Sequence, residues 1–388
     1  MTDTTLAIPG EKTSGDAVSA NYGVSADRID RAGWLGLIQD FDDTTVFQTW
    51  DYEAVRWGEQ RLSHLALEEA GQVVAAAQVR VVRMPVLNCG VAYVYAGPLW
   101  RRRGNPADVE VFRQILKALY REYVEKQGLA LRLVPNEVQT EDGRVGETLL
   151  ECGFSRLARV KPYRSFLIDL AQPEDRLIAG FRSRYRTRVR SAIRNNVEVE
   201  AGTSDRLFEE FVQVYRLMRQ RKQFEERVDV RDFQEIQSRL PDPLKMQVTV
   251  CRLEGVPAAA AVCGAIGNTG NLLLMATSRA ALKTSASVAT VWRAMVELKN
   301  SGIRYFDVGG VDPEDNPGGY TFKSCFGGHE IFHVGVYEAC NNLLSRLVTH
   351  GGERLRGAAR KSSELAGRIL PGQAGPADEP QGEHEESK

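Results

Sequence analysis

The sequence predicts an α/β (α+β) protein of two tandem domains, each with a mixed, mostly antiparallel sheet flanked by helices, joined by an arginine-rich helix. The first observation is an internal repeat, because residues 65–79 and 248–262 each hold an apolar run, a turn at glycine and an alanine-rich run. The second is that the same order of patterns follows each copy. A hairpin that leads into a strand–helix–strand crossover favours mixed sheets over a doubly wound Rossmann fold.

The periodicity of the apolar residues justifies each element of the two copies. Short β-rich or apolar runs bounded by turn residues predict strands, and apolar residues every three or four positions predict helices. In the first copy these patterns predict a strand, a helix and two further strands at 91–96, 107–126, 129–134 and 163–170. In the second copy the equivalents lie at 272–276, 286–300, 303–308 and 331–337.

Composition divides the chain into six parts. Residues 1–27 are rich in Thr, Ser, Gly and Asp, and residues 371–388 carry five acidic residues and three prolines, so both ends are expected to be disordered. The folded parts are expected to be a domain at 28–172, a linker helix at 173–196, a second domain at 197–340 and a C-terminal helix at 341–370.

Length and charge exclude several protein classes. The chain has 388 residues, 43% hydrophobic and 26% charged residues and a net charge of −1, values typical of a globular protein with two domains. No apolar run approaches the roughly 20 residues of a membrane span, so membrane contact is expected to be peripheral. The N-terminus lacks the layout of a signal peptide, which predicts a cytoplasmic protein with access to the inner membrane face.

The densest group of candidate catalytic residues lies at 303–337. A predicted strand ends near Asp307, Gly309 and Gly310 open a loop, and Lys323 follows a Pro/Gly/Asp-rich stretch. Glycines allow close approach of the backbone to a ligand, and a lysine held beside them suits stabilisation of an oxyanion in acyl transfer. The alternative is that Asp307 caps a turn and Lys323 is a solvated surface residue.

Two motifs frame this loop, Phe306-Asp307-x-Gly309-Gly310 and Gly319-Tyr320-x-Phe322-Lys323-x-x-Phe326-Gly327-Gly328, with Gly335 in the last predicted strand. Together with the run 193–200 and the turn Tyr95-x-Gly97-Pro98, they resemble the FemABX family. This family consists of tandem-GNAT transferases that add amino acids from aminoacyl-tRNA to peptidoglycan precursors. The resemblance spans about residues 30–345 and implies that Lys323 stabilises the tetrahedral intermediate and that Phe322 helps to place the acyl donor. Asp307 is the nearest candidate for a general base.

Acceptor binding is expected at the glycine loop and at two helical segments. The family's acceptor-contacting helix has an LM-x-x-T-x-x-R pattern, but the run 215–222 has no threonine and a shorter spacing. Its residues therefore suit either an acceptor pyrophosphate or an exposed amphipathic face. The chain also lacks the long helical arm that some members insert, which favours the compact branch of the family. The expected acceptor-binding residues are Tyr215, Arg219, Arg221, Gly309, Gly310 and Tyr320.

A loop before the helix at 107–126 is a candidate CoA site. GNAT enzymes bind the pyrophosphate of acetyl-CoA with an [RQ]-x-x-G-x-[GA] loop at a helix N-terminus. Arg101, Arg103 and Gly104 supply such a loop, but Pro106 departs from the pattern at its last position. A plain helix start is the alternative interpretation.

The arginine-rich segment 181–194 is a candidate nucleic-acid contact, because it carries six arginines in fourteen residues. Arg186 and Arg190 lie four residues apart on one helix face and could contact phosphates of tRNA or of a nucleotide-linked acceptor. A solvated helix face is the alternative.

Metal and thiol chemistry are not expected. The six cysteines include no CxxC pair, which argues against a disulfide or zinc framework. Cys325, His329 and His333 have helical ligand spacing, but the neighbouring glycines and the β-like run predict a strand, in which these residues lie about 13 Å apart.

The sequence thus predicts an acyltransferase that moves an aminoacyl group from aminoacyl-tRNA to an amine of a peptidoglycan precursor or another amine acceptor, with no required cofactor. One alternative is an acetyl-CoA-dependent N-acetyltransferase that acts on an envelope sugar or a small amine. Another is a non-catalytic module that binds nucleic acid or a partner protein through the arginine-rich helix.

Overall fold

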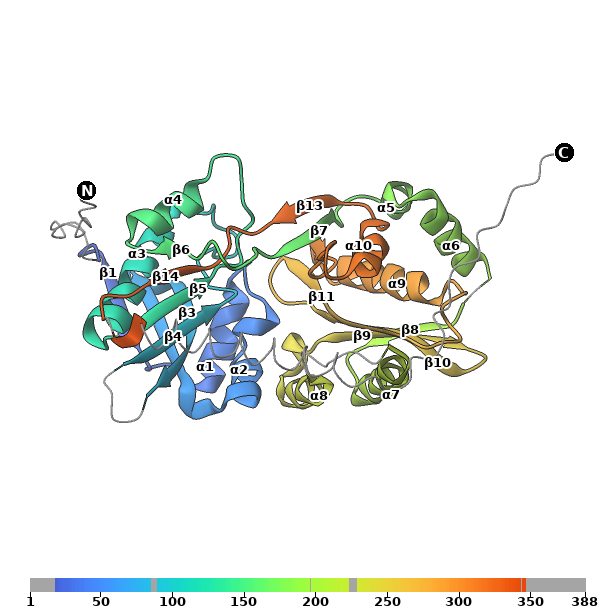
Figure 1. The fold of residues 1–388 in the computed structure, drawn as a ribbon, viewed down its shortest axis with the longest axis horizontal. Coiled ribbons are helices and arrows are strands. Elements are labelled where there is room, and N and C mark those ends of the chain that lie inside the picture. The colour runs from blue at the N-terminus through green and yellow to red at the C-terminus, as the bar shows by residue number, and fades with distance from the viewer. Residues whose placement is uncertain (1–17, 85–88, 196, 223–228, 343, 347–388) are drawn as a thin grey trace, which may run out of the picture.

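The computed structural model describes residues 18–84, 89–195, 197–222, 229–342 and 344–346. Within them the chain forms two mixed seven-stranded sheets flanked by helices, one from each copy of the repeat (Figure 1). None of the described helices has the length and apolar character needed to cross a membrane.

The first sheet has the order β1-β2-β3-β4-β5-β14-β6, with β4 and β5 parallel and the other pairs antiparallel. Its strands are β1 (Tyr22–Ala26), β2 (Leu62–Glu69), β3 (Gln72–Arg83), β4 (Gly90–Tyr95), β5 (Ala130–Val134), β6 (Ser155–Arg156) and β14 (Tyr337–Ala339). Its helices are α1 (Arg31–Leu37), α2 (Trp50–Trp57), α3 (Val109–Leu119), which continues as a π-helix over Tyr120–Lys126, and α4 (Arg144–Glu151). Short 3-10 helices lie at Ile38–Asp40, Val46–Gln48 and Glu59–Arg61.

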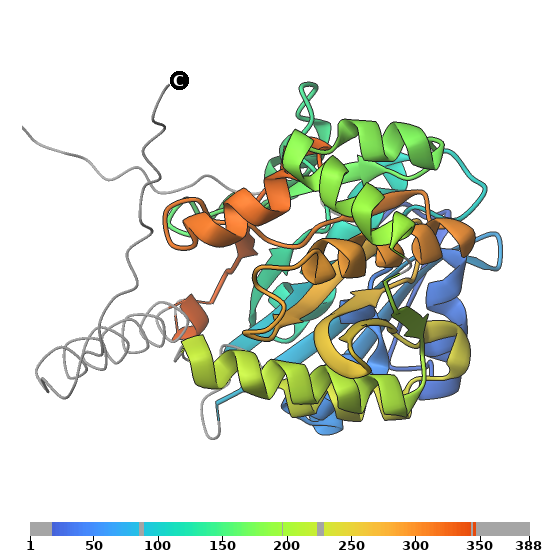
Figure 2. The ribbon, with the colours of Figure 1, turned by 90° about the vertical axis from the view of Figure 1, so that its right-hand side faces the viewer.

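The second sheet has the order β13-β7-β12-β11-β10-β9-β8. Its strands are β7 (Arg164–Asp169), β8 (Val199–Gly202), β9 (Gln247–Leu253), β10 (Val256–Gly264), β11 (Thr269–Thr277), β12 (Tyr305–Asp307) and β13 (His329–Phe332). Its helices are α5 (Glu174–Gly180), α6 (Ser183–Arg194), α7 (Asp205–Lys222), α8 (Val230–Arg239), α9 (Ala286–Asn300) and α10 (Pro317–Ser324), with a 3-10 helix at Asp242–Leu244. Figure 2 shows α7 on one face of this sheet and α9, with α5 and α6, on the other.

The predicted fold class is confirmed, and so is the repeat. The hairpins β2–β3 and β9–β10 correspond to the two similar segments, and each leads into a strand, a helix and a parallel strand. The helix predicted at 286–300 coincides with α9, which is buried over most of its circumference between Ala286 and Leu298. The helix predicted at 107–126 begins instead at Val109, where the Asp108 side chain caps it by accepting a hydrogen bond from the backbone N–H of Glu110.

The last strand of each copy lies in the sheet of the other copy, which differs from the expected assignment. β7 pairs antiparallel with β12 and β13 in the second sheet. β14 pairs antiparallel with β5 and β6 in the first. The strand expected at 331–337 is divided, because β13 ends at Phe332 before the chain crosses to the first sheet. A pattern of apolar residues predicts a strand but does not select the strand with which it pairs. The domain boundary expected near residue 172 therefore does not coincide with the point at which the chain changes sheets.

Three further expectations change in detail. Residues 22–26 are not disordered, because β1 pairs with β2, whereas residues 1–17 lie outside the described part. The single linker helix expected at 173–196 is divided into α5 and α6, because the backbone is extended at Phe181. The Phe181 ring packs against Trp292 and Phe326. Most of the helix expected at 341–370, and the tail at 371–388, lie outside the described residues.

One hydrophobic core joins the two halves of the molecule. Side chains of the α1–α2 region, such as Trp34 and Phe41, pack in the same cluster as Phe208 of α7 and Val248 of β9. The backbones also meet, because the N–H of Asn268 donates to the carbonyl of Asp42 at 2.9 Å. Each half also has a core of its own on the other face of its sheet, so the shared cluster joins two packed halves.

Gly267 marks the tightest part of this contact. Its φ is +72°, and a Cβ atom there would lie 2.5 Å from the carbonyl oxygen of Asp42. We expect Gly267→Ala to lower the free energy of unfolding by about 3 kcal/mol, because backbone strain and a backbone clash add. Urea denaturation measures this loss. The matched control is Gly255→Ala, with φ +77° and open space around the position, for which we expect only about 1 kcal/mol. Equal losses in both variants would contradict the close contact.

Candidate active site

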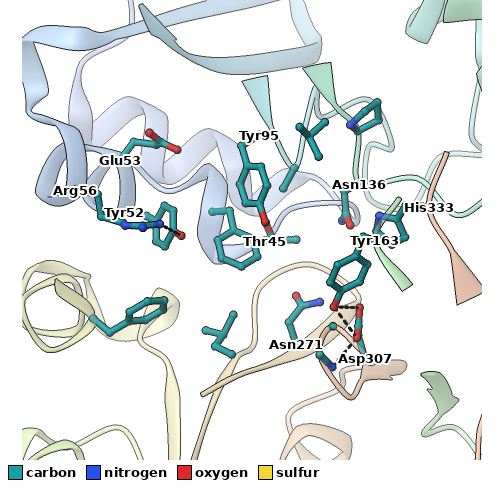
Figure 3. A pocket seen from close by; sticks show the side chains of 18 of the residues that line it. Thr45, Tyr52, Glu53, Arg56, Tyr95, Asn136, Tyr163, Asn271, Asp307 and His333 are labelled. Carbon is teal, nitrogen blue, oxygen red and sulfur yellow. Dashed lines mark hydrogen bonds between the residues drawn. The ribbon is translucent and has the colours of Figure 1, made fainter. Parts of the chain in front are cut away.

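A cavity of about 420 Å³ lies between the two sheets, where strands β11 and β12 part. The two strands pair in parallel only as far as Asn271 and Asp307. Beyond these residues β11 continues, while the chain after β12 turns away at Gly309. The opening between the strands faces α2 and β4 of the first half, which complete the cavity wall. Figure 3 shows the side chains that line it.

Asp307 holds the glycine loop in place. Its buried carboxylate accepts hydrogen bonds from the hydroxyl of Tyr163 at 3.1 Å, from the hydroxyl of Ser165 and from the backbone N–H of Gly309 at 2.8 Å (Figure 3). Gly309 has φ +81°, and a Cβ there would lie 2.5 Å from the carbonyl oxygen of Leu272. Burial and the Asp307 carboxylate raise the pKa of Tyr163 well above its usual value, so its phenol stays a donor.

Lys323 lies behind this loop, in the last turn of α10. Its Nζ donates to the carbonyl oxygen of Gly310 at 2.9 Å, and a Cβ at Gly309 would lie 3.0 Å from Nζ. Burial lowers the pKa of Lys323 to about 8, against the opposing effect of Asp307. The side chain is therefore mostly charged at neutral pH. Both glycines line the cavity, so the ammonium group stands directly behind the cavity wall.

The ring of Phe322 belongs to the core beneath Lys323. It packs against Tyr185 of α6 and against Phe326, with ring centroids 5.8 and 5.2 Å away. The helix that carries Lys323 begins at Asn316, whose side chain accepts from the N–H of Gly319. These contacts fix the orientation of α10 and so the position of the lysine.

His333 lies on the segment that crosses from β13 to β14. Its backbone N–H donates to the carbonyl of Tyr163 at 2.8 Å, and its ring lies 4.8 Å from the Tyr163 ring. Burial lowers the pKa of His333, with Asp307 opposing this effect, so the imidazole is neutral at neutral pH. The sequence spacing indicates His333 only as a candidate for metal or thiol chemistry, because its place beside Tyr163 depends on the strand exchange.

The wall contributed by the first half is aromatic and cationic. The Arg80 guanidinium lies 4.2 Å from the Trp57 ring and 4.8 Å from the Tyr93 ring, and it approaches Glu53 at 3.5 Å. Arg56 lies over the ring of Tyr52. Motif spacing does not predict this wall. The available signals were weak, namely an aromatic residue and an arginine four apart in α2, and alternate tyrosines in β4.

A second chamber of about 220 Å³ adjoins the cavity and shares Asn136, Asn271, Asp307 and His333 with it. Asp43 and Glu137 line this chamber. Burial raises the pKa of Asp43 to about 6 and that of Glu137 to about 7. Neither residue lies in a motif that the sequence reveals.

The structure brings the glycine loop and Lys323 together, whereas other expected binding residues lie elsewhere. Tyr320 packs against Phe166, with ring centroids 5.6 Å apart. Tyr215 is 7% exposed and belongs to the shared core, because the buried face of α7 includes it. Arg221 donates to the carbonyl of Thr277 at 3.2 Å, and Arg219 is exposed on α7. None of these four residues lines the cavity.

The candidate CoA loop is occupied by interactions within the protein. Arg101 pairs with Glu137 at 2.5 Å in the second chamber, and Arg103 approaches Asp42 at 3.3 Å. Gly104 turns with φ +78° in open space. The Asp108 carboxylate caps α3, where a pyrophosphate would have to bind. This geometry does not favour CoA at the loop.

The two arginines chosen for nucleic-acid contact differ in their surroundings. Arg186 donates to the carbonyl oxygens of Ala179 and Phe181 at 3.0 and 2.9 Å, so it caps the C-terminus of α5. Arg190 is exposed on α6. Among the described residues, no group of three or more His, Cys, Asp or Glu side chains is arranged to hold a metal ion.

Comparisons with known proteins agree with this architecture. A family model described as an acetyltransferase (GNAT) domain matches residues 179–324, which hold most of the second copy. No curated protein matches the chain by sequence.

Solved structures match the whole tandem arrangement. The structure of FemX has a TM-score of 0.71 at 15% identity, over 84% of this chain and 99% of that chain. The C-terminal domain of a putative lysylphosphatidylglycerol synthetase from Agrobacterium fabrum has a TM-score of 0.52 at 14% identity, over 84% and 98%. A conserved protein of unknown function from Bacteroides thetaiotaomicron has a TM-score of 0.50 at 10% identity, over 82% and 99%.

The domain match covers the part of the chain that contains Lys323, and the likeness to FemX extends over both sheets. The architecture thus agrees with the family resemblance of the glycine loop and its lysine. The chain therefore has a tandem fold like that of FemX, with a match to a GNAT acetyltransferase domain at residues 179–324, and these features support an acyltransferase.

Proposed function

We propose that this acyltransferase moves an aminoacyl group from aminoacyl-tRNA to an amine of a peptidoglycan precursor in the cavity between the two sheets. The observation that carries the proposal is the opening between β11 and β12, with the Lys323 ammonium directly behind its glycine wall. The resemblance of this loop to the FemABX family supports aminoacyl-tRNA as the donor and a peptidoglycan precursor as the acceptor. The reaction would take place in the cytoplasm, with the inner membrane face within reach of a lipid-linked acceptor.

The reaction joins the acceptor nitrogen to the aminoacyl carbon. The neutral amine attacks the ester carbonyl, the tetrahedral intermediate forms, and the ester C–O bond then breaks to release the tRNA hydroxyl. One proton passes from the amine to the departing oxygen, directly or through solvent. The Lys323 ammonium stabilises the negative charge on the carbonyl oxygen in the intermediate. Its placement behind the Gly309–Gly310 wall allows the ester to approach the backbone closely.

Asp307 serves this reaction by positioning the loop. Its Oδ1 accepts hydrogen bonds from Tyr163, Ser165 and Gly309, and the bond from Gly309 keeps the glycine turn closed. These three donors support a positioning role for Asp307.

The aromatic and cationic wall supports an acceptor with anionic groups and ring faces. Arg56 and Arg80 complement phosphate or carboxylate groups. The rings of Tyr93 and Tyr95 offer apolar faces on the same strand, which suit the apolar face of a sugar. A peptidoglycan precursor carries all of these features.

An acetyl-CoA-dependent N-acetyltransferase that acts on an envelope sugar or a small amine is the second candidate function. The match to an acetyltransferase domain favours it. The use of Arg101 and Asp108 within the protein argues against CoA at the loop of the first half. Either donor would present its carbonyl carbon at the same cavity.

A transfer assay with purified protein distinguishes the donors and tests Lys323. We expect labelled aminoacyl-tRNA to serve as donor for a muropeptide precursor, and we expect Lys323→Met to reduce kcat by about 100- to 1,000-fold because one oxyanion donor is lost. The exposed Lys161, which pairs with Glu314, provides the matched control Lys161→Met, for which we expect no change in kcat. Transfer from acetyl-CoA alone would replace the aminoacyl proposal by the second candidate. Full activity of Lys323→Met would remove the lysine from the mechanism.

The pH dependence of the reaction provides an independent test of the same lysine. Because the pKa of Lys323 is lowered to about 8, the ammonium form is present below this pH and is lost as the pH rises through it. We expect the ratio of wild-type kcat to that of Lys323→Arg to fall about tenfold per pH unit above pH 8, since arginine stays charged. Ionisation of the acceptor amine affects both enzymes equally, so its effect on kcat cancels in the ratio. A constant ratio between pH 7 and pH 10 would show that the charge of Lys323 is not needed.

A further inference from the structure

Transfer of an acyl group to an amine needs a group that takes the proton of the amine. Such a base presents a lone pair within hydrogen-bond reach of the reacting nitrogen, about 3 Å away. Two carboxylates line the main cavity, but Glu53 approaches the Arg80 guanidinium at 3.5 Å, and Oδ1 of Asp307 holds the glycine loop through three donors. Protonation of either carboxylate would weaken contacts that shape the cavity. Of the described residues that line it, His333 alone carries an imidazole.

The backbone around His333 fixes the place of this imidazole. Its N–H donates to the carbonyl of Tyr163 at 2.8 Å, and the residue forms an isolated antiparallel bridge with Val138. The N–H of the next residue, Val334, donates to the carbonyl of Glu137 at 2.9 Å. The crossing segment is thus held on both sides, which is the rigid support that a catalytic side chain requires.

The surroundings of the ring determine its tautomer. The imidazole is neutral at neutral pH, and its hydrogen bond to the carbonyl of Pro135 opposes the effect of burial on the pKa of His333. Because a carbonyl oxygen only accepts, the ring nitrogen that faces it carries the hydrogen, and the other nitrogen holds a lone pair. His333 is partly exposed and lines the main cavity, so a bound acceptor can reach the ring.

One aromatic ring separates this imidazole from the glycine loop. The Tyr163 ring lies 4.8 Å from the His333 ring (Figure 3), and a Cβ at Gly310 would lie 3.1 Å from Cε2 of Tyr163. At the point of attack the acceptor nitrogen lies about 3 Å from the carbonyl carbon and about 3 Å from its base. A base one ring away from the wall where the ester binds matches this spacing.

We propose that His333 is the general base of the acyl transfer. Its unprotonated ring nitrogen accepts a proton from the acceptor amine as the N–C bond forms. The imidazolium then returns the proton to the departing oxygen as the ester C–O bond breaks, in place of direct or solvent-mediated transfer. The inference rests on the proposed function, because it needs an amine acceptor, but it holds for either acyl donor.

The pH dependence of this role follows from the neutral form that a base uses. Burial lowers the pKa of His333, and Asp307 opposes this effect, so activity is present above that pKa and is lost as the pH falls through it. The other charged groups that share a space with His333 are Asp42, Asp43, Arg101 and Glu137 in the second chamber and Glu53, Arg56 and Arg80 in the main cavity. They remain in a His333 variant, so their own titration cancels in the ratio of wild-type to variant rates.

Profiles of kcat and KM against pH for wild type, His333→Asn and His333→Gln test the proposal. The two amides each place a donor near one of the two ring nitrogens, so one variant keeps the hydrogen bond to Pro135, but neither can take a proton. We expect kcat to fall about 100- to 10,000-fold in both with little change in KM. The ratio of wild-type to variant kcat is expected to fall as the pH drops through the lowered pKa of His333. His329→Asn, at an exposed position of β13, is the matched control and is expected to keep full activity.

Chemical rescue separates a base from a residue that only supports the fold. We expect added imidazole to restore part of the activity of His333→Ala in proportion to its concentration, and the Asn and Gln variants keep the test if the alanine variant fails to fold. Wild-type kcat in either amide variant, or a loss that is independent of pH and is not rescued, would overturn this inference alone. A wild-type protein that transfers from neither donor would overturn the proposed function and this role with it.

Discussion

The exchange of one strand between the two copies is the constraint on which the active site depends. The chain crosses from the first sheet to the second before β7 and returns before β14, and the two crossing segments are hydrogen-bonded to each other through His333 and Tyr163. Tyr163 and His333 therefore lie on the two segments that cross between the sheets, and these segments place both side chains at the cavity. The common core beneath α1, α2 and α7 holds the two sheets at a fixed distance, so the cavity keeps its shape.

Burial decides the charge states inside this space. Asp307 is buried, but three donors satisfy its carboxylate, and it organises the loop. Lys323 loses part of its hydration and becomes a weaker base, while Asp307 nearby keeps it charged at neutral pH. Asp43 is also buried, and its carboxylate accepts hydrogen bonds from the backbone N–H groups of Trp100 and Arg101, but burial dominates and raises its pKa to about 6. Similar side chains thus differ in role because their neighbours differ.

The division of labour between the halves follows from this arrangement. The second half supplies the opening between β11 and β12, with the lysine behind it, and the proposed reaction places the acyl donor there. The first half supplies a wall of rings and guanidinium groups, and the proposed reaction places the acceptor against it. Residues of both halves line the cavity, so neither half encloses it alone.

The sequence by itself determined most of the elements and the glycine loop with its lysine. The hairpins, α9 and the strand before Asp307 follow from local periodicity, and the glycines with Lys323 lie within one short segment that motif spacing describes. Only the tertiary structure decided the strand exchange, the burial of Tyr215 and the pairing of Tyr163 with Asp307, which are 144 residues apart. The acidic chamber likewise joins Asp43 and Glu137 with the second sheet. The physical reason is that apolar periodicity fixes which face of an element is buried, whereas the partner of that face is selected by packing between distant segments.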